Sequence, residues 1–205
     1  QAAYESLGEQ ARQAAHLRIG RLLLQHYDET QISQELFAII GQLNLGLHLI
    51  TERQEKRQLA TLNLQAAKQA KLASVWDAAL AYANTGVELL NEHSWQSDYA
   101  LSFELHSVQV ECEFLVSNHQ QGKVLAEKLL EQAQTPLEKA RICLLLGSQQ
   151  ITLELDYCIA KGLEGLTYCG LPTPTLAQID DALVKQEHHK IDVLLEQQDW
   201  KEHTK

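Results

Sequence analysis

Small side chains recur three times along this sequence at the spacing of one helix face. Each copy starts at a bulky or polar residue and places mostly small residues three, seven and ten positions later. The copies are Trp76, Ala79, Ala83 and Gly86; His119, Gly122, Ala126 and the larger Leu129; and Leu155, Cys158, Gly162 and Gly165. Small residues at this spacing allow two helices to approach closely. Recurrence within roughly 20–50 residues is typical of stacked helical repeats.

The rest of the sequence also favours helices. Apolar residues fall three and four positions apart, and no sustained alternation indicates strands. The sequence therefore predicts an all-α fold of about nine helices, at 9–27, 31–49, 52–72, 76–91, 98–116, 120–133, 136–152, 155–169 and 175–198. Antiparallel hairpins of these helices are expected to stack into a superhelix. We expect a single repeat domain over 1–205, with an atypical hairpin in 1–50, three hairpins in 52–170 and a C-terminal helix in 175–198.

Local signals predict several helix ends. Thr135, Pro136 and Glu138 have the spacing of a capping box with proline in the first turn. The pairs Thr51–Gln54 and Thr175–Gln178 predict two further helix starts of this kind. Residues 93–97 are expected to form a loop. The first helix, 9–27, is expected to turn its apolar side inward, with Ala15, Ile19, Leu22 and Leu23 on that side.

Composition and charge narrow the function classes. The chain has 205 residues, 45% of them hydrophobic, and a net charge of −10, which fits a globular protein with a substantial core. Residues 72–122 contain seven acidic residues and no lysine or arginine. An acidic run of this kind argues against binding to a phosphate backbone, which needs clustered cations. It is typical of a solvated face, and it also fits a surface for a basic partner.

No motif for catalysis or for a cofactor is present. The sequence has no Walker-type phosphate loop, no GxGxxG, no GxSxG and no HExxH. Its four cysteines contain no CxxC pair and are expected to be buried, reduced thiols. We therefore predict no catalytic residues, no metal site, no cofactor and no enzymatic activity for this chain. The chain begins at Gln1 and contains no methionine, which we interpret as an excised fragment of a larger protein.

Two groups of residues are candidates for a structural or binding role. The small-residue pattern predicts that its members pack helix against helix, with Trp76 in the core. These residues are Trp76, Ala79, Ala83, Gly86, Gly122, Ala126, Cys158, Gly162 and Gly165. For Gly162 and Gly165, close approach of a ligand is the alternative to packing. On helix 52–72, Lys68 and Lys71 are predicted to be polar residues of a groove that binds a partner.

The repeated pattern resembles the tetratricopeptide repeat, with its small residues on the second helix of each unit. This sequence departs from that pattern at the usual glycine between the two helices. Ser74, Ser117 and Leu153 stand there instead.

A second resemblance covers nearly the whole chain. It rests on the stretches QAAY (1–4), HLRIGRLLL (16–24), LNLGLHLI (43–50), LNLQAAKQAK (62–71), TPLEKAR (135–141) and GLEGL (162–166). With these stretches the sequence resembles the helical segment that follows the STAND-type AAA ATPase module in very large bacterial signalling proteins. Those proteins also carry a Ser/Thr kinase-like domain and often a sensor histidine kinase. This resemblance implies a cytoplasmic, non-catalytic relay between a nucleotide-driven switch and an output domain.

Two functions are favoured at this point over a third alternative, a hydrolase or transferase. The first is a helical-repeat scaffold for protein–protein or interdomain contacts and signal relay within a signalling ATPase or kinase. The second is a sensor domain that binds a small-molecule inducer in a cavity enclosed by the helices. The expected partners are other domains of the same chain or another protein, with a small-molecule effector as an option and with no nucleic acid or membrane.

Overall fold

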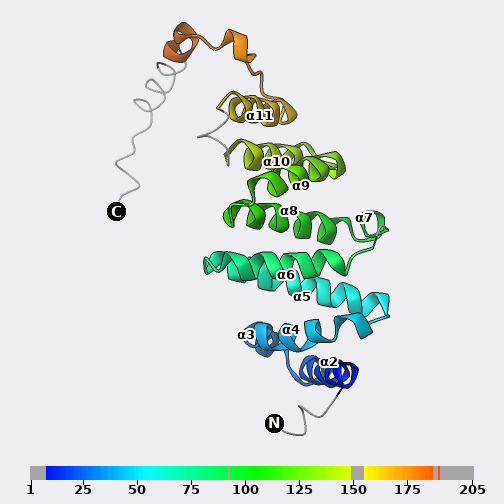
Figure 1. Ribbon diagram of the computed structural model, residues 1–205. Helices are drawn as coiled ribbons and strands as arrows, with labels where there is room; N and C mark the ends of the chain where they lie inside the picture. Colours follow the sequence, from blue (N-terminus) through cyan, green and yellow to red (C-terminus); the bar gives the residue numbers. More distant parts are fainter. Residues whose placement is uncertain (1–7, 92, 149–154, 187–188, 190–205) are drawn as a thin grey trace, which may run out of the picture. The chain divides into compact units, whose positions relative to one another are not determined.

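The computed structural model describes residues 8–91, 93–148, 155–186 and 189 (Figure 1). These residues form helices and the connections between them, without strands. The prediction of an all-α fold of packed helices is confirmed. The chain divides into two compact units, Gln1–Gln132 and Ala133–Lys205. A single domain over 1–205 therefore stays a prediction, and each unit is described by itself.

The first unit contains most of the helices. They are α2 (Glu9–His26), α3 (Glu29–Gln34), α4 (Leu36–Leu45), the 3₁₀ turn η1 (Leu47–Leu49), α5 (Arg53–Leu72), α6 (Trp76–Glu88), α7 (Ser94–Ser97), α8 (Tyr99–Leu115) and α9 (His119–Gln132). The second unit contains α10 (Pro136–Ser148), α11 (Leu155–Tyr168) and the 3₁₀ turn η2 (Leu176–Gln178).

The hairpin at 1–50 differs from its prediction in its second half. The expected helix 31–49 is divided into α3, α4 and η1, with a break at Glu35, whose φ and ψ are −100° and 16°. A capping box that the sequence analysis missed starts α3. The Asp28 side chain accepts a hydrogen bond of 2.8 Å from the Gln31 backbone, and the Gln31 side chain accepts one of 3.0 Å from the Asp28 backbone. This box begins the helix at Glu29, two residues earlier than predicted.

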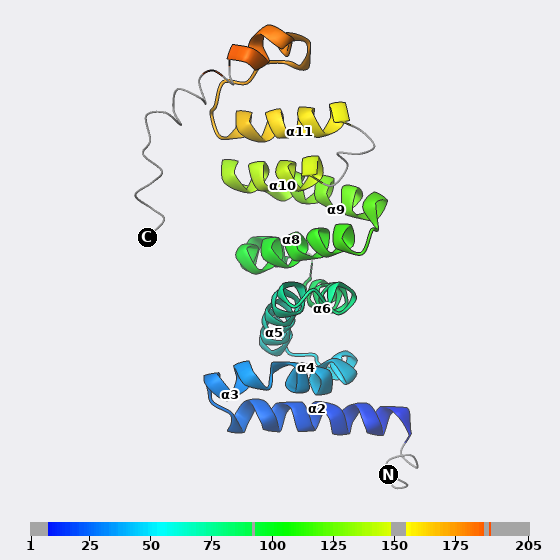
Figure 2. The same ribbon diagram turned by 90° about the vertical axis from the view of Figure 1, so that its left-hand side faces the viewer.

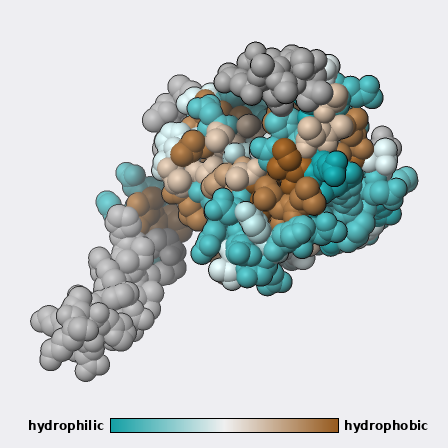
Figure 3. Space-filling view, turned by 90° about the horizontal axis from the view of Figure 1, so that it is seen from below, coloured by the Kyte–Doolittle hydropathy of each residue, from teal (hydrophilic) through white to brown (hydrophobic). Residues whose placement is uncertain are grey.

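The inward side of α2 agrees with the predicted one only in part. Ala15 and Leu23 are partly buried, and Leu23 packs against the core. Ile19 and Leu22 are 46% and 44% exposed, and Leu17 and Gly20 are buried instead. A Cβ on Gly20 would lie 2.5 Å from Leu43 Cδ2, so this glycine is the point of closest approach between α2 and α4. Helix packing selects the side with the smallest residue, and the apolar residues beside it remain at the surface. Figure 3, which views the α2 end of the first unit, shows hydrophobic residues gathered on that face.

The helix predicted at 52–72 starts at Arg53 as α5, but not through the expected cap. Glu52 is its N-cap residue, and no side chain caps the helix, so the Thr51–Gln54 box is wrong. Residues 93–97, predicted as a loop, contain the one-turn helix α7.

Two serines end helices at positions where the repeat pattern usually has glycine. Ser74 and Ser117 have φ values of 59° and 65°, in the left-handed region. After Ser74, the Val75 N–H donates to the Ala70 carbonyl at 2.9 Å, and after Ser117 the Asn118 N–H donates to the Glu113 carbonyl at 2.8 Å. These bonds are the six-to-one bonds of a Schellman motif, which satisfies carbonyls at the end of a helix. The backbone geometry of the glycine is thus kept without the glycine.

We expect Ser74→Gly and Ser117→Gly to stabilise the protein by roughly 0.5 kcal/mol each. A side chain in the left-handed region costs ~1–2 kcal/mol, and the extra freedom of glycine in the unfolded chain offsets ~0.5–1 kcal/mol of that gain. Urea denaturation followed by circular dichroism measures the difference. The neighbouring Ala73, with φ of −80°, provides the control, because Ala73→Gly should destabilise. Equal effects of Ala73→Gly and Ser74→Gly would contradict this explanation.

The small-residue pattern of the first unit lies in its helix contacts. Ala79 and Ala83 are fully buried, and a Cβ on Gly86 would lie 2.4 Å from Leu105 Cδ2 of α8. Figure 2 shows α8 lying over the α5–α6 hairpin. In the next copy, Ala126 is fully buried, and a Cβ on Gly122 would lie 2.8 Å from the Phe114 ring. The small residues therefore bring α6 against α8, and α9 against α8.

Trp76 departs from its expected place in the core. It is 41% exposed, because it is the first residue of α6 and the packed side of that helix begins only at Ala79. The prediction of a buried Trp76 is wrong.

The second unit starts with the predicted capping box. The Thr135 N–H donates to Glu138 Oε2 at 2.8 Å, and the Glu138 N–H donates to Thr135 Oγ1 at 3.2 Å. Helix α10 packs on α11 through glycines on both helices. A Cβ on Gly147 would lie 3.0 Å from the Cys158 carbonyl oxygen, and one on Gly165 would lie 3.1 Å from Cys143 Cβ. Cys158 is buried.

A Cβ on Gly162 would itself meet nothing within 4 Å, although the Gly162 nitrogen lies 3.8 Å from where a Cβ on Gly147 would be. The role of Gly162 in helix packing stays a prediction. This position opens onto a groove that is described below.

The C-terminal helix begins later than predicted. The Thr175 N–H does donate to the Gln178 side chain at 2.8 Å, but these residues enclose only the 3₁₀ turn η2. The chain becomes helical at 181–186, where Asp180 Oδ1 accepts a hydrogen bond of 2.8 Å from the Leu183 N–H. Most of the remainder of the predicted helix lies outside the described residues.

Candidate functional site

The two lysines predicted to line a groove are engaged within the first unit. Lys68 Nζ lies 2.6 Å from Glu104 Oε2, and Lys71 forms an ion pair with Glu111. Both pairs join α5 to α8. Their role in holding a partner stays a prediction, and such a partner would have to displace Glu104 or Glu111.

The N-terminal half of α5 makes a similar connection to the start of α8. Arg57 Nε lies 2.5 Å from Asp98 Oδ1, and Arg53 Nη2 lies 3.8 Å from Asp98 Oδ2. Hydrogen bonding from Arg57 holds the pKa of the Asp98 carboxyl below its usual value, although the partial burial of this group opposes the shift. Together with Glu104 and Glu111, three acids of the cation-free run 72–122 are therefore bound by α5. The pairing with α5 accounts for these three acids, so they need not be explained by a solvated face or by a basic partner.

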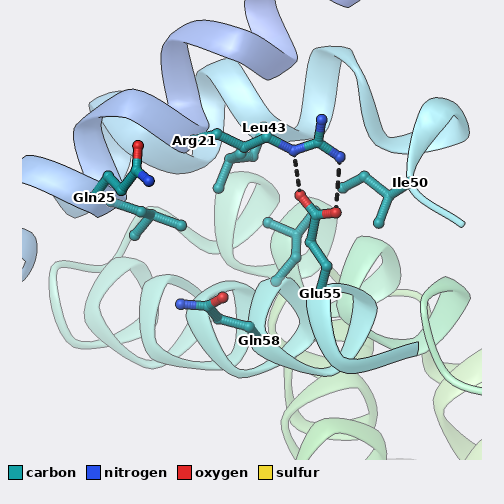
Figure 4. Close-up of a pocket in the computed structure, with 8 residues that line it drawn as sticks. Arg21, Gln25, Leu43, Ile50, Glu55 and Gln58 are labelled. Carbon is teal, nitrogen blue, oxygen red and sulfur yellow. Dashed lines mark hydrogen bonds and ion pairs between the residues drawn. The ribbon is translucent and has the colours of Figure 1, made fainter. Parts of the chain in front are cut away.

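One recess of the first unit is a cleft between α2, α4 and α5 (Figure 4). It has a volume of about 480 Å³. Eight residues line it: Arg21, Leu24, Gln25, Leu43, Ile50, Glu55, Gln58 and Leu59. Leu43, Ile50 and Leu59 are each only 2% exposed, so they are core residues that also line this recess.

The polar residues of the cleft come from two different helices. Arg21 of α2 pairs with Glu55 of α5 through two bonds, Nε to Oε1 at 2.7 Å and Nη2 to Oε2 at 2.8 Å (Figure 4). The hydrogen bond to Glu55 raises the pKa of the Arg21 guanidinium. Gln25 and Gln58 lie on the same two helices and are exposed. The cleft therefore combines apolar residues with amide groups and one closed ion pair, which is an arrangement suited to binding.

No feature of the sequence predicts this cleft. Arg21 and Glu55 are 34 residues apart, and neither belongs to a recognisable motif. No signal in the sequence connects them, because their pairing depends on how α2 packs beside α5.

A second recess in the other unit is almost entirely apolar. It is a groove of about 480 Å³ along α10 and α11, lined by Leu137, Ala140, Arg141, Leu144, Gly162, Gly165, Leu166 and Cys169. Leu137, Leu144 and Leu166 are 75%, 67% and 44% exposed. Exposed apolar residues that gather in one groove are typical of an interaction surface or a ligand-binding groove.

The buried cysteines have the properties of core residues. Cys112, Cys143 and Cys158 are buried free thiols, and Cys169 is exposed. Burial raises the pKa of the Cys112 and Cys143 thiols to about 11, so both are protonated at neutral pH. Nucleophilic cysteines require the opposite shift. Within the described part of the chain, no group of His, Cys, Asp and Glu is placed to hold a metal ion.

These thiols predict a pH dependence of stability. The folded protein keeps protons on Cys112 and Cys143 up to a pKa of about 11, whereas the unfolded chain releases them near the ordinary value of 9.0. Because the unfolded state binds fewer protons above pH 9, stability should fall between pH 9 and 11. We expect the Cys112→Ala/Cys143→Ala variant to lose less stability over this interval in urea denaturation. Cys169→Ala is the control and should keep the full dependence. Parallel pH profiles for all three proteins would contradict the assignment.

Within the described residues, no helix combines the length and the apolar character that crossing a membrane requires.

Comparison with known proteins finds a similarity to a signalling protein. Over 181 residues the chain is 26% identical to hybrid signal transduction histidine kinase G of Dictyostelium discoideum. The alignment covers 76% of this chain but only 5% of that protein. No protein-family model matches the sequence. No solved structure matches it significantly.

Proposed function

We propose that this chain is a non-catalytic helical scaffold within a larger signal transduction protein. Its similarity to a small part of a hybrid signal transduction histidine kinase supports this proposal. In that setting, the scaffold makes contacts with neighbouring domains or with another protein and relays conformational change between them. A STAND-type ATPase domain beside it, and a bacterial source, belong to the same proposal.

The cleft between α2, α4 and α5 is the observation that carries the proposal. A partner would place an apolar side chain against Leu43, Ile50 and Leu59, which already form part of the core. The amides of Gln25 and Gln58, on either side, would bind polar groups of the partner. A few buried apolar anchors surrounded by polar contacts supply most of the affinity in protein interfaces.

The ion pairs of α5 give this site a connection to the rest of the first unit. Glu55 binds α2, and further along the same helix Lys68 and Lys71 bind α8. A partner that displaces α2 relative to α5 would therefore change the contacts of α5 with α2, and a resulting movement of α5 would change its contacts with α8. Packed and paired residues that run from α2 through α5 to α8 are a physical route by which a conformational change could be relayed.

A cleft-filling variant tests the proposal. Gln58→Trp places a bulky side chain in the cleft, whereas Gln65→Trp places the same side chain on an exposed position of the same helix outside the cleft. In the complete signalling protein, we expect Gln58→Trp to reduce the signal-dependent change in phosphoryl-transfer activity by at least about fivefold. Gln65→Trp should leave it unchanged. Equal responses of the two variants would refute a relay through this cleft.

A small-ligand sensor is the second candidate, and the same cleft favours it. Its volume of about 480 Å³ lies within the range of roughly 300–1,000 Å³ that small-molecule sites occupy. A ligand at one hundred times its Kd would stabilise the folded protein by about 2.7 kcal/mol. A thermal-shift screen of metabolites should then give a rise in Tm that Gln58→Trp abolishes. A rise that persists in Gln58→Trp would place the ligand elsewhere.

A further inference from the structure

Helices α6, α7, α8 and α9 of the first unit border a recess that shares no residue with the cleft between α2, α4 and α5. Its volume of about 550 Å³ lies within the range of roughly 300–1,000 Å³ that small-molecule sites occupy. The residues that line it are Val87, Trp95, His106, Gln109, Leu125, Lys128, Leu129, Glu131 and Gln132. Its size alone admits a small ligand, and its lining decides which kind.

Aromatic rings form one wall of this recess. The one-turn helix α7 places Trp95 against α8, where its ring centroid lies 5.0 Å from that of His106. Hydrogen bonds hold this turn: the Asn91 N–H donates to Ser94 Oγ at 3.0 Å, and the Asp98 N–H donates to the Ser94 carbonyl at 2.8 Å. The Trp95 ring is partly exposed and lines the recess. It therefore offers a fixed surface against which a flat ring can pack.

His106 gives the same wall a polar atom. Its Nδ1 lies 2.8 Å from the Ser102 carbonyl oxygen, which can only accept, so Nδ1 carries the proton and donates. Burial holds the pKa of the His106 imidazole below its usual value, although the bond to Ser102 opposes the shift, so the ring is neutral at pH 7. Within the residues that the structure describes, only Nδ1 of this ring is hydrogen-bonded. The lone pair of Nε2 can therefore accept a hydrogen bond from a ligand.

The residues of α9 favour a ligand without net charge. Leu129, which is only 2% exposed, contributes apolar surface to the recess. Lys128 and Glu131 lie exposed on the same helix and carry opposite charges. Their fields oppose each other, so the recess strongly attracts neither an anion nor a cation. The lining thus combines apolar surface, a flat aromatic wall and a neutral acceptor.

We propose that this recess binds an uncharged, planar heteroaromatic compound that packs its ring against Trp95 and donates an N–H to His106 Nε2. Indole is a small probe of this class. The recess is a ligand site additional to the cleft, and it does not depend on the function proposed for the cleft.

A matched pair of probes tests the hydrogen bond. Benzothiophene has the shape of indole but carries a sulfur atom in place of the N–H, so it can pack against Trp95 without donating to His106. Ligand-observed NMR titrations at neutral pH measure the binding of each probe to the full chain. We expect His106→Phe, which keeps an aromatic ring, to weaken indole binding about tenfold, since one hydrogen bond in a partly buried site is worth about that factor. The same variant should change benzothiophene binding less than about twofold.

Two further variants locate the probes. Trp95→Ala should weaken the binding of both probes about fivefold, because packing against an aromatic ring is worth about that factor. Trp76→Ala is the matched control. Trp76 is 41% exposed at the start of α6 and does not line the recess, so its removal should change neither affinity.

A measurement on the wild-type protein needs no variant and therefore tests the hydrogen bond even if His106→Phe does not fold. The nitrogen resonance of His106 Nε2 should shift when indole is added and not when benzothiophene is added. The proposal is wrong if indole shows no saturable binding, or if this resonance responds equally to both probes.

Gln58→Trp, which fills the cleft, separates this proposal from the one made for the cleft. It should leave indole binding unchanged, because Gln58 does not line the recess. Loss of indole binding in Gln58→Trp, with binding retained in Trp95→Ala, would place indole in the cleft and would overturn the proposal.

Discussion

Gly46→Ala should destabilise the protein by about 3 kcal/mol, which is the upper part of the usual range for overpacking. A Cβ on Gly46 would lie 2.7 Å from Leu17 Cβ, 2.8 Å from the Gln13 carbonyl oxygen and 3.3 Å from Leu17 Cα. Two of these three atoms belong to the backbone of α2, so no rotamer change can relieve the contact. The φ of −109° at Gly46 suits any residue, and the cost is therefore steric rather than conformational. Helix α2 would have to move away from α4 and η1.

Gly41 provides the matched control on the same helix. It is exposed in α4, and a Cβ there would meet nothing within 4 Å. Because alanine is the better helix former by ~0.5–1 kcal/mol, Gly41→Ala should stabilise the protein. In urea denaturation, we therefore expect the same Gly→Ala substitution to lower the free energy of unfolding at Gly46 and to raise it at Gly41. A stability loss below 1 kcal/mol for Gly46→Ala would show that α2 and α4 are not in tight contact at this point.

Asn63→Ala should cost a similar amount, about 3 kcal/mol, for a different reason. Asn63 is fully buried and forms a reciprocal amide pair with Asn44: its Nδ2 donates to Asn44 Oδ1 at 3.0 Å, and its Oδ1 accepts from Asn44 Nδ2 at 2.9 Å. A further bond runs from Asn63 Nδ2 to the Leu59 carbonyl at 3.0 Å. The truncation would leave a cavity beside the Asn44 amide, which is partly buried and would lose its partner. The loss is measured by urea denaturation.

The partner residue makes this prediction a double-mutant cycle. Asn44→Ala should destabilise by about 2 kcal/mol, because it leaves the buried Asn63 oxygen without a donor. In the double variant Asn44→Ala/Asn63→Ala, the loss should be smaller than the sum of the two single losses, since neither amide remains unpaired. Gln65→Ala, at an exposed position of α5, is the control and should change stability by no more than ~0.5 kcal/mol. Additive losses would show that the amide pair contributes nothing specific.

The helices and several of their ends follow from local patterns in the sequence. The fold class follows from apolar residues three and four positions apart, and the α10 start follows from Thr135 and Glu138, which bind each other's backbone. These features depend on residues within one turn of each other. Interactions between residues that are close in the sequence can be predicted from the sequence, without a structure.

Which side of each helix is buried, and which distant residues meet, depends on how the helices pack together. On α2, Gly20 rather than Ile19 faces α4, because close approach depends on the neighbouring helix as well as on apolar character. The cation-free segment 72–122 contains acids whose partners lie earlier in the chain, on α5.

Both candidate sites are likewise products of helix packing. Arg21 and Glu55 meet over a separation of 34 residues, and the groove beside Gly162 exists because α10 and α11 pack through Gly147 and Gly165. Helical period and caps are local properties, whereas a cleft, an ion pair between helices and an open groove are properties of how helices pack.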